Sequence, residues 1–178
     1  MKSVERKTRE TDVRIEMSQG TGTASVSTGS RFLDHMMTTL ARYSGLDITV
    51  AAKGDIKHHL IEDVAIAAGS ALAGVIPDAC ARYANRTVAM DDALVQAVLD
   101  AGGRAYYEGP LPSNLYEQWM RSFADNANIT LHISVLRGKD RHHIVEAAFK
   151  ALGFALRQAL AEGGEVFSTK GPISLEDV

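Results

Sequence analysis

The sequence has little of the chemistry on which several classes of small protein depend. Its 178 residues include one cysteine, Cys80, which excludes an intrachain disulfide framework and a zinc centre built from several thiolates. No apolar run reaches the roughly 20 residues of a membrane-spanning helix, and residues 1–7 lack the apolar segment of a signal peptide. A net charge of −3 exerts no long-range attraction on nucleic acid. We therefore expect a cytoplasmic protein with neither a nucleic-acid nor a membrane partner.

What the sequence contains is typical of a globular protein. Apolar residues make up 46% and charged residues 23%, which is enough to bury a core in one domain or in two small fused ones. Cys80 lies in an apolar stretch that we expect to be helical, where it fills space. Any recognition of phosphate has to come from local groups of lysine and arginine.

One short motif occurs twice. Residues 58–62 read His-His-x-x-Glu, and the same pattern returns 84 residues later at 142–146. On a helix the first histidine and the glutamate, at positions i and i+4, share a face. The second histidine is turned about 100° away from the first. Each copy therefore predicts half of two metal sites, which need further ligands from elsewhere.

Hydrophobic periodicity predicts the same order of elements in both halves. In the first half we expect a hairpin of strands 12–18 and 24–28, a helix over 33–41 ended by Gly45, a strand over 48–52, and a helix carrying the first motif. In the second half we expect strands at 87–90, 93–100 and 105–107, a helix over 115–123, a strand over 128–135, and a helix from His142.

This repetition predicts an α+β fold with an internal duplication of a β-β-α-β-α unit. Each half would be a sheet covered by two helices. We expect the first repeat at residues 1–86 and the second at 87–178, fused as one compact catalytic unit because no linker-like stretch separates them.

Six histidines and two glutamates form the candidate metal ligands. A single histidine near a helix start commonly caps the helix or lies on the surface, but two equivalent copies of one motif favour metal binding. Without thiolates a structural zinc site is disfavoured, and manganese, iron, cobalt, nickel and zinc all remain open. Since adjacent histidines face different ways, we expect ligands from different subunits of a homo-oligomer. The candidate ligands are His35, His58, His59, Glu62, His132, His142, His143 and Glu146.

A second group of residues suits phosphate. Ser168, Lys170 and the neighbouring glycine bring a hydroxyl, a cation and backbone N–H groups together. Arg86 and Arg104 each lie beside a predicted turn. Lys150 follows Glu146 by four residues, so it either forms a helical ion pair or reaches the substrate.

Together these motifs resemble imidazoleglycerol-phosphate dehydratase, a lyase of histidine biosynthesis. The resemblance runs from about residue 6 to 173 and rests on both His-His-x-x-Glu copies, the segments around His35 and His132, Ser168 to Gly171, and the opening Arg-x-Thr-x-Glu-Thr at 6–11. It implies a duplicated fold of the ribosomal S5 domain 2-like type. It also implies trimers assembled into a shell of 24 subunits, with two manganese ions in each inter-subunit active site. Only Ile56 and Lys57 separate Asp55 from His58, which is shorter than is usual for the family.

The resemblance also implies roles for single residues. The eight candidate ligands match the family's metal positions, Glu10 matches a carboxylate that reaches the substrate, and Glu146 or a metal-bound water is the second choice for proton transfer. Arg86, Arg104, Ser168 and Lys170 match its phosphate-binding residues, with Lys150 alongside. The reaction would remove water from imidazole glycerol phosphate to give imidazole acetol phosphate. Two rival functions remain: a metal-storing shell without catalysis, which needs no phosphate residues, and a two-metal phosphohydrolase, which favours carboxylate-rich ligands.

Overall fold

The computed structural model describes residues 1–163, so the predicted phosphate residues Ser168 and Lys170 lie outside the described part of the chain. The first half contains β1 (Lys2–Lys7), β2 (Thr11–Gln19), β3 (Ala24–Ser27), α1 (Arg31–Ser44), β4 (Leu46–Gly54) and α2 (Lys57–Ala73). The second half contains β5 (Tyr83–Met90), β6 (Ala93–Asp100), β7 (Tyr106–Glu108), α3 (Asn114–Ala127), β8 (Thr130–Arg137) and α4 (Arg141–Ala159). The predicted α+β duplication is confirmed, and each unit has one strand more than the β-β-α-β-α pattern.

Each half forms one four-stranded sheet, in the orders β1-β2-β4-β3 and β5-β6-β8-β7. The predicted hairpin between residues 12–18 and 24–28 is wrong, because β2 pairs with β1 and β4 while β3 pairs in parallel with β4. Alternating apolar residues reveal which face of a strand is buried but not which strand lies beside it. The connection after β2 is held by Asp47 in β4, whose carboxylate accepts hydrogen bonds from the backbone N–H groups of Thr21 (3.0 Å) and Thr23 (2.8 Å).

The strand β1 was not predicted from the sequence. Its residues read Lys-Ser-Val-Glu-Arg-Lys, which contains no alternation of apolar side chains. It lies at the edge of its sheet, where charged residues are common because they discourage pairing with a further strand. Val4, opposite Ile15 of β2, is the residue of β1 that packs against the core.

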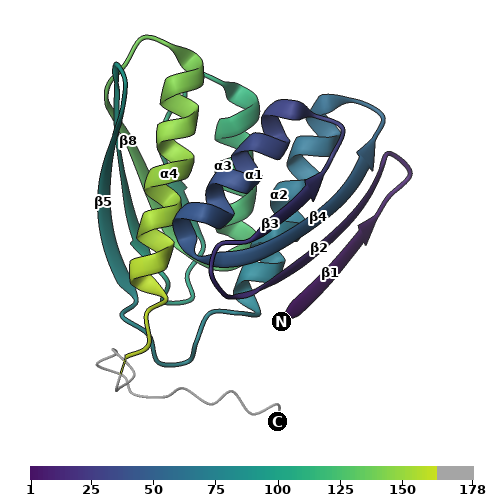
Figure 1. The fold of residues 1–178 in the computed structure, drawn as a ribbon, viewed down its shortest axis with the longest axis horizontal. Coiled ribbons are helices and arrows are strands. Elements are labelled where there is room, and N and C mark those ends of the chain that lie inside the picture. Colours follow the sequence, from purple (N-terminus) through teal and green to yellow (C-terminus); the bar gives the residue numbers. More distant parts are fainter. Residues whose placement is uncertain (164–178) are drawn as a thin grey trace.

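The four helices lie between the two sheets (Figure 1). α1 and α2 pack on the first sheet and α3 and α4 on the second, as predicted, and α2 also packs on α3 and α1 on α4. The ring of Trp119 lies 4.9 Å from that of Phe123 and 4.5 Å from that of Phe149, all fully buried. Burying a side chain of this size contributes about 2–3 kcal/mol. One continuous core thus joins the halves and brings helix ends from both of them together.

The segment between the halves runs from the end of α2 at Ala73 to the start of β5 at Tyr83. The predicted boundary at residues 86 and 87 falls inside β5, and the division into those two repeats stays a prediction. The helical setting expected for Cys80 is wrong: the residue is buried, but it forms an isolated bridge with Glu162. Pro77 disfavours continuation of the helix there. No helix within residues 1–163 is both long and apolar enough to span a membrane.

Candidate metal centre

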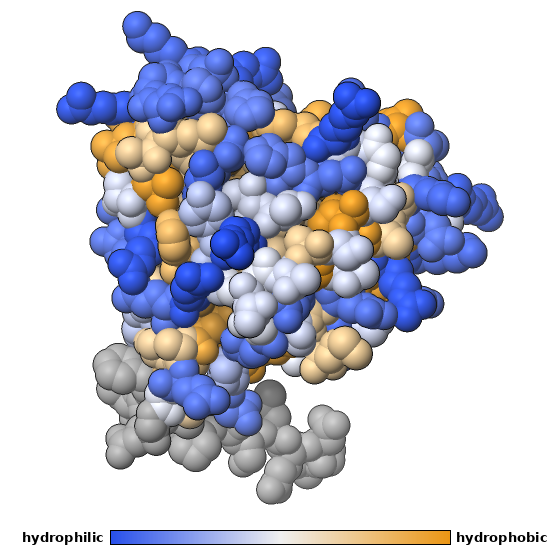
Figure 2. Space-filling model, viewed as in Figure 1, coloured by the Kyte–Doolittle hydropathy of each residue, from blue (hydrophilic) through white to orange (hydrophobic). Residues whose placement is uncertain are grey.

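Both copies of the His-His-x-x-Glu motif lie at the start of a helix, α2 and α4, as predicted. At α4 the N-cap residue is Asp140, whose carboxylate accepts hydrogen bonds from the backbone N–H groups of His142 (2.7 Å) and His143 (3.4 Å). Such a cap fixes the residue at which the helix begins, and with it the direction of each histidine. Figure 2 shows hydrophilic residues gathered at this end of the molecule, at the upper left. The second motif is thus presented at a polar end of the protein.

Three candidate ligands from two helices meet around one carboxylate. Oε2 of Glu146 lies 3.1 Å from Nε2 of His142 in α4 and 3.2 Å from Nε2 of His35 in α1. The three ligand atoms all lie within 4.8 Å of one another, close enough to hold one ion. Nζ of Lys150 lies 2.9 Å from the other oxygen, Oε1. We call His35, His142, Glu146 and Lys150 the α4 cluster.

The charge of Glu146 is maintained although the residue is 6% exposed. Burial acts to raise its pKa, but hydrogen bonds from Lys150 and His35 outweigh burial and lower the pKa below its ordinary value. Burial likewise acts to lower the pKa of Lys150, and the hydrogen bond to Glu146 raises it overall. Lys150 also contacts Sδ of Met90 at 3.5 Å and lies 5.6 Å from the ring centre of Tyr43. The predicted ion pair is present, and it keeps the carboxylate ionised.

His35 reaches this cluster because the start of α1 is fastened in place. Oδ1 of Asp34 accepts hydrogen bonds from the backbone N–H and the hydroxyl of Thr28, at 2.8 and 2.6 Å. The ring of Phe32 packs edge-on against His142, with centroids 5.1 Å apart, and against Tyr116 of α3, at 5.0 Å. These contacts seat α1 on α4 across the boundary between the halves.

The first motif has different surroundings. Nε2 of His58 lies 3.7 Å from Oε2 of Glu62, the same i, i+4 pairing as in α4. His59 faces away from this pair, with Nδ1 at 2.8 Å from Asp55 and 3.4 Å from Glu10. The prediction that adjacent histidines face different ways is therefore confirmed, and the two rings are almost perpendicular, at 83°. We call Glu10, Asp55, His58, His59 and Glu62 the α2 cluster.

A glutamine occupies the place in the α2 cluster that His35 occupies in the α4 cluster. Gln118 is the fifth residue of α3 as His35 is the fifth of α1. Its Nε2 donates to Oε1 of Glu62 at 3.4 Å and to Oγ of Ser122 at 3.2 Å. An amide side chain is a weaker metal ligand than an imidazole, so this helix pair does not supply a third nitrogen.

The second histidine of each copy is oriented by carboxylates. Nδ1 of His143 lies 2.7 Å from Oδ1 of Asp92, and its Nε2 lies 3.4 Å from Asp91. The hydrogen bond to Asp92 raises the pKa of His143, and that to Asp55 raises the pKa of His59. A carboxylate at Nδ1 fixes the tautomer that offers Nε2 to a metal and makes the ring more basic. A metal binds the neutral imidazole, so metal binding would displace the proton from any of these rings that is protonated.

Asp92 does more than orient His143. Its Oδ2 accepts the backbone N–H groups of Lys139 (2.6 Å) and Asp140 (3.2 Å), which hold the loop before α4. The hydrogen bond to His143, followed by these two, lowers its pKa well below the ordinary value. One carboxylate in the turn between β5 and β6 thus fixes both the helix start and a candidate ligand.

Four residues that contact candidate metal ligands were not predicted from the sequence. Asp55 precedes His59 by four residues, a spacing that could have been found because Asp55 borders the motif. The short loop before His58 therefore provides support for His59 directly. Asp91 and Asp92 come from the turn between β5 and β6, and Gln118 comes from α3. All three are distant in sequence from the motifs they contact, and no local pattern indicates them.

The remaining predicted residues do not join either cluster within the described chain. His132 lies on the exposed face of β8, opposite Val98 of β6 and Glu108 of β7, with its ring centre 5.5 Å from that of Tyr106. Its neighbours Leu131 and Ile133 are buried on the helix side, so the predicted alternation is confirmed.

The predicted phosphate residues are only partly described. Arg86 lies in β5 of the second sheet and Arg104 in the loop before β7, and both are exposed. The backbone oxygen of Arg104 accepts a hydrogen bond from Thr130 at 3.0 Å. Ser168 and Lys170 lie outside residues 1–163, so the assembly of the four into one site stays a prediction.

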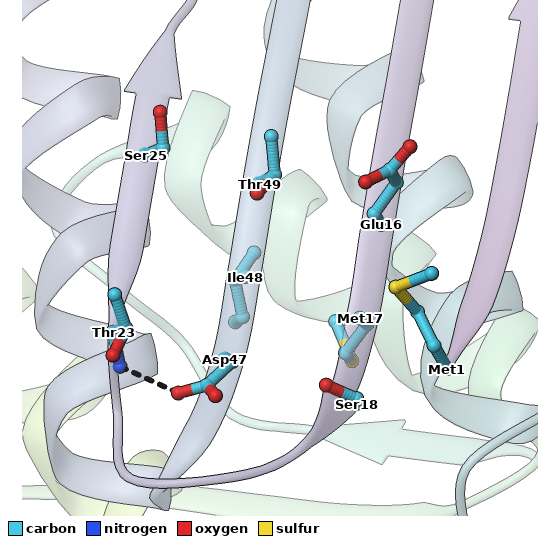
Figure 3. Close-up of a pocket in the computed structure, with 9 residues that line it drawn as sticks. All are labelled: Met1, Glu16, Met17, Ser18, Thr23, Ser25, Asp47, Ile48 and Thr49. Atoms are coloured by element: carbon cyan, nitrogen blue, oxygen red, sulfur yellow. Dashed lines mark hydrogen bonds between the residues drawn. The ribbon is translucent and has the colours of Figure 1, made fainter.

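A hollow of about 200 Å³ lies over the first sheet, away from these residues. Figure 3 shows its lining by residues of β2, β3 and β4 together with Met1 and Thr23, and the backbone N–H of Thr23 donates a hydrogen bond to Asp47. Backbone N–H groups of Thr23 and Thr21 lower the pKa of Asp47, which therefore serves the connection after β2. The hollow contains none of the predicted site residues.

Comparison with known proteins gives one consistent family. The family model described as imidazoleglycerol-phosphate dehydratase matches residues 28–156. Proteins with this name from Methanosarcina mazei and Salinibacter ruber are 42% and 43% identical. These alignments cover 96% and 97% of this chain, and 97% and 95% of the respective relatives.

Solved structures give the same family. IGPD from Pyrococcus furiosus, crystallised in complex with (S)-C348, superposes with a TM-score of 0.87 at 37% identity, over 96% of this chain and all of that one. Imidazoleglycerol-phosphate dehydratase from Staphylococcus aureus superposes with a TM-score of 0.82 at 33% identity, over 90% and 98% of the two chains.

Proposed function

The chain belongs to the imidazoleglycerol-phosphate dehydratase family, and from that membership we propose how its residues share the work of the reaction. The activity is that of a hydro-lyase, which removes water from imidazole glycerol phosphate. Membership of this family favours neither of the rival functions, the metal-storing shell and the two-metal phosphohydrolase. We assign the product, imidazole acetol phosphate, to histidine biosynthesis, and the protein to the cytoplasm, where a lone cysteine stays reduced.

The α4 cluster is the observation that carries the proposal of a metal-dependent site. It gathers two imidazoles and one ionised carboxylate within 4.8 Å, from helices of both halves. Imidazole and carboxylate donors suit manganese among other ions, and we propose two manganese ions per active site. When bound, they supply Lewis acidity toward the nitrogens of the substrate ring. The proposed ligands are His35, His58, His59, Glu62, His132, His142, His143 and Glu146.

We propose that the active site forms between subunits. His132 is exposed on a sheet face that also presents Tyr106 (50% exposed), Val98 (39%) and Leu136 (51%). Exposed apolar side chains of this size are suited to cover by another protein surface. A second copy lying against this face would bring His132 to a cluster that it does not reach within its own chain. The shell of 24 subunits built from trimers is the assembly that we propose on the family resemblance.

Glu10 is the candidate for proton transfer. The proton lost in the dehydration lies next to no carbonyl group, so it is not acidic and needs a positioned base. The carboxylate of Glu10 is exposed at the α2 cluster, 3.4 Å from His59. Glu146, the second choice, has both oxygens engaged by Lys150 and by two histidines. We therefore assign Glu146 to metal binding and Lys150 to holding its charge beside the substrate.

Arg86, Arg104, Ser168 and Lys170 are the proposed phosphate-binding residues. Both arginines are exposed, Arg86 in β5 and Arg104 in the loop before β7, where a ligand that carries two negative charges can reach them. Binding energy from a phosphate distant from the reacting atoms is best used to position the ring. Lys170→Ala should therefore raise KM for the phosphorylated substrate and leave the metal content unchanged.

The test of the metal-dependent function is removal and return of the metal. Protein treated with a chelator and dialysed should lose dehydration of imidazole glycerol phosphate and regain it when Mn²⁺ is added. His35→Gln serves as the matched variant, since it should regain much less at the same Mn²⁺ concentration. Full activity in metal-free protein would refute the role of the metal.

The test of the shared site is complementation between two inactive variants. His132→Ala and Glu146→Ala should each be inactive alone. If a site takes these residues from different chains, dissociating and reassembling the two variants together should recover activity, because some sites then receive both native residues. No recovery, with mixed assemblies demonstrated by mass, would place both residues in one chain's site. Size-exclusion chromatography with and without chelator would show whether the assembly depends on metal.

A further inference from the structure

We propose that Asp63 is a positioning residue that holds Glu10 at the α2 cluster, an inference that rests on the proton-transfer role proposed for Glu10. Asp63 follows His59 by four residues in α2, so both project from the same face of the helix. The residue is 7% exposed, and its two carboxylate oxygens accept hydrogen bonds from Arg6 in β1 and Thr11 in β2. The helix that carries three candidate metal ligands therefore also anchors the segment that carries Glu10.

The anchor consists of two contacts to the two carboxylate oxygens. Nε of Arg6 donates to Oδ1 of Asp63 at 2.7 Å, and the hydroxyl of Thr11 donates to Oδ2. Arg6 is the second-to-last residue of β1, and Thr11 is the first residue of β2, so the two lie on either side of the loop that joins these strands. Thr11 is itself 5% exposed. A single buried carboxylate thus fixes both ends of a loop of three residues.

The loop is closed by further hydrogen bonds that lead to Glu10. Oγ1 of Thr8 accepts the backbone N–H groups of Glu10 (3.1 Å) and Thr11 (3.0 Å) and lies 3.0 Å from Oγ1 of Thr11. The carbonyl oxygen of Glu10 accepts the backbone N–H of Asp55 at 3.0 Å. The backbone of Glu10 is therefore held from both sides, and its side chain is directed toward His59.

The equivalent position in the second half of the molecule has no such carboxylate. At the position 84 residues after Asp63 the chain has Ala147, and β5 passes to β6 through a turn of Asp91 and Asp92 alone. The two sheets have the same strand order, so the sheet itself does not require a buried carboxylate at this place. Within residues 1–163 the anchor occurs only in the half where the loop carries Glu10.

Asp63→Asn provides the first test. Asparagine has the same size, but its amide nitrogen cannot accept a hydrogen bond from Arg6 or Thr11. A displaced catalytic group costs on the order of 10–100-fold in rate. We expect kcat to fall by about that factor, with KM and the metal content unchanged. Thr11→Val removes one hydroxyl and should have the same effect to a smaller degree, and Thr11→Ser should restore kcat.

Asp100→Asn is the matched control, because Asp100 pairs with an arginine, Arg82, at the same distance of 2.7 Å and its side chain is 23% exposed. It should lower stability without changing kcat. Hydrogen exchange at the amides of Glu10 and Thr11 should be at least about tenfold faster in Asp63→Asn and unchanged in Asp100→Asn. Unchanged exchange, or loss of bound metal in Asp63→Asn, would overturn the proposal.

The two proposals fail in distinguishable ways. If Glu10→Gln retains full activity, the role of Glu10 in proton transfer is wrong. If Glu10→Gln is impaired, adding Asp63→Asn to it should lower the residual kcat no further, because the group that Asp63 positions is already absent. Losses that multiply in the double variant would mean that Asp63 acts through something other than Glu10.

Discussion

The two His-His-x-x-Glu copies have the same position in each half but different neighbours. In both, the first histidine faces the glutamate one turn later, at 3.7 Å in α2 and 3.1 Å in α4. Glu146 is buried, with an imidazole and an ammonium group beside it, whereas the side chain of Glu62 is 35% exposed. Gln118 and Ile66 occupy the places equivalent to His35 and Lys150.

This difference separates what duplication provides from what packing provides. Duplication repeats the helix and the spacing of its ligands. The packing of α1 on α4 adds His35 to one copy, while α3 adds an amide to the other. The α4 cluster therefore collects three donors within one chain. In the α2 cluster α3 brings an amide rather than an imidazole to Glu62, and there we expect His132 of another subunit as a further donor.

The largest expected effect comes from removing the glutamate of either copy. Glu146→Ala should abolish turnover and release metal, with a loss beyond the roughly 10–100-fold that an outer partner of a metal site contributes. Glu62→Ala is its counterpart in the other copy. Metal analysis of each variant should find one ion fewer per chain than in the native protein. A Glu146→Ala protein that kept its activity would remove the metal role of the α4 cluster.

Exchanging the equivalent residues of α1 and α3 should sharpen the comparison. His35→Gln gives the α4 cluster the amide of the α2 cluster, and we expect its metal affinity to fall by about 100-fold, the upper end for a change at one position. Gln118→His supplies an imidazole beside Glu62 and should strengthen binding there. Titration with Mn²⁺ measures both. Equal affinities in native protein and His35→Gln would show that packing of α1 on α4 contributes no ligand.

The carboxylates behind the second histidines should have a smaller effect. Asp92→Asn removes the acceptor at Nδ1 of His143, and Asp55→Asn that of His59. We expect each to lower metal affinity by about 10-fold, the lower end for such partners. Asp92→Asn should also lower stability, because Asp92 holds the loop before α4 as well. A larger loss of stability in Asp55→Asn than in Asp92→Asn would contradict the second role of Asp92.

Lys150→Met should lower the stability of the folded chain. It leaves the buried carboxylate of Glu146 without its cation, which costs about 1–3 kcal/mol in the free energy of unfolding of the metal-free protein. Urea unfolding after chelation gives this value. Double substitution with Glu146→Gln should recover part of the loss, since the unpaired charge is then gone. No recovery would mean that Lys150 stabilises the fold through Met90 or Tyr43 instead.

The smallest expected effect is a dependence of the free energy of unfolding on pH below about 4.5. The pKa of Glu146 in the folded protein lies below its ordinary value of 4.5. Its ionisation therefore adds stability that is present above about pH 4.5 and is lost as the pH falls through the lowered folded value. In metal-free protein, Glu146→Gln should reduce the decline in unfolding free energy below pH 4.5. Parallel declines in the two proteins, measured by urea unfolding at several pH values, would contradict this.

Much of the fold and part of the site could be predicted from the sequence. The i, i+4 pairs and the opposed directions of the adjacent histidines follow from helix geometry alone. The strand β1 was missed because an edge strand needs no apolar alternation, and the β2–β3 hairpin was wrong because alternation does not specify a partner. Asp91, Asp92 and Gln118 were missed because they approach the motifs through contacts between distant segments.

The sequence by itself determined the duplicated order of elements, the ligand types and their spacing on each helix, since these depend on periods of two and 3.6 residues. Only the tertiary structure decided that His35 joins Glu146, that Gln118 joins Glu62, and that Asp63 holds the loop of Glu10. The physical reason is that these pairs arise where elements from distant parts of the chain pack together. Charges that become buried in this packing need partners, and the local sequence does not show which charges will be buried.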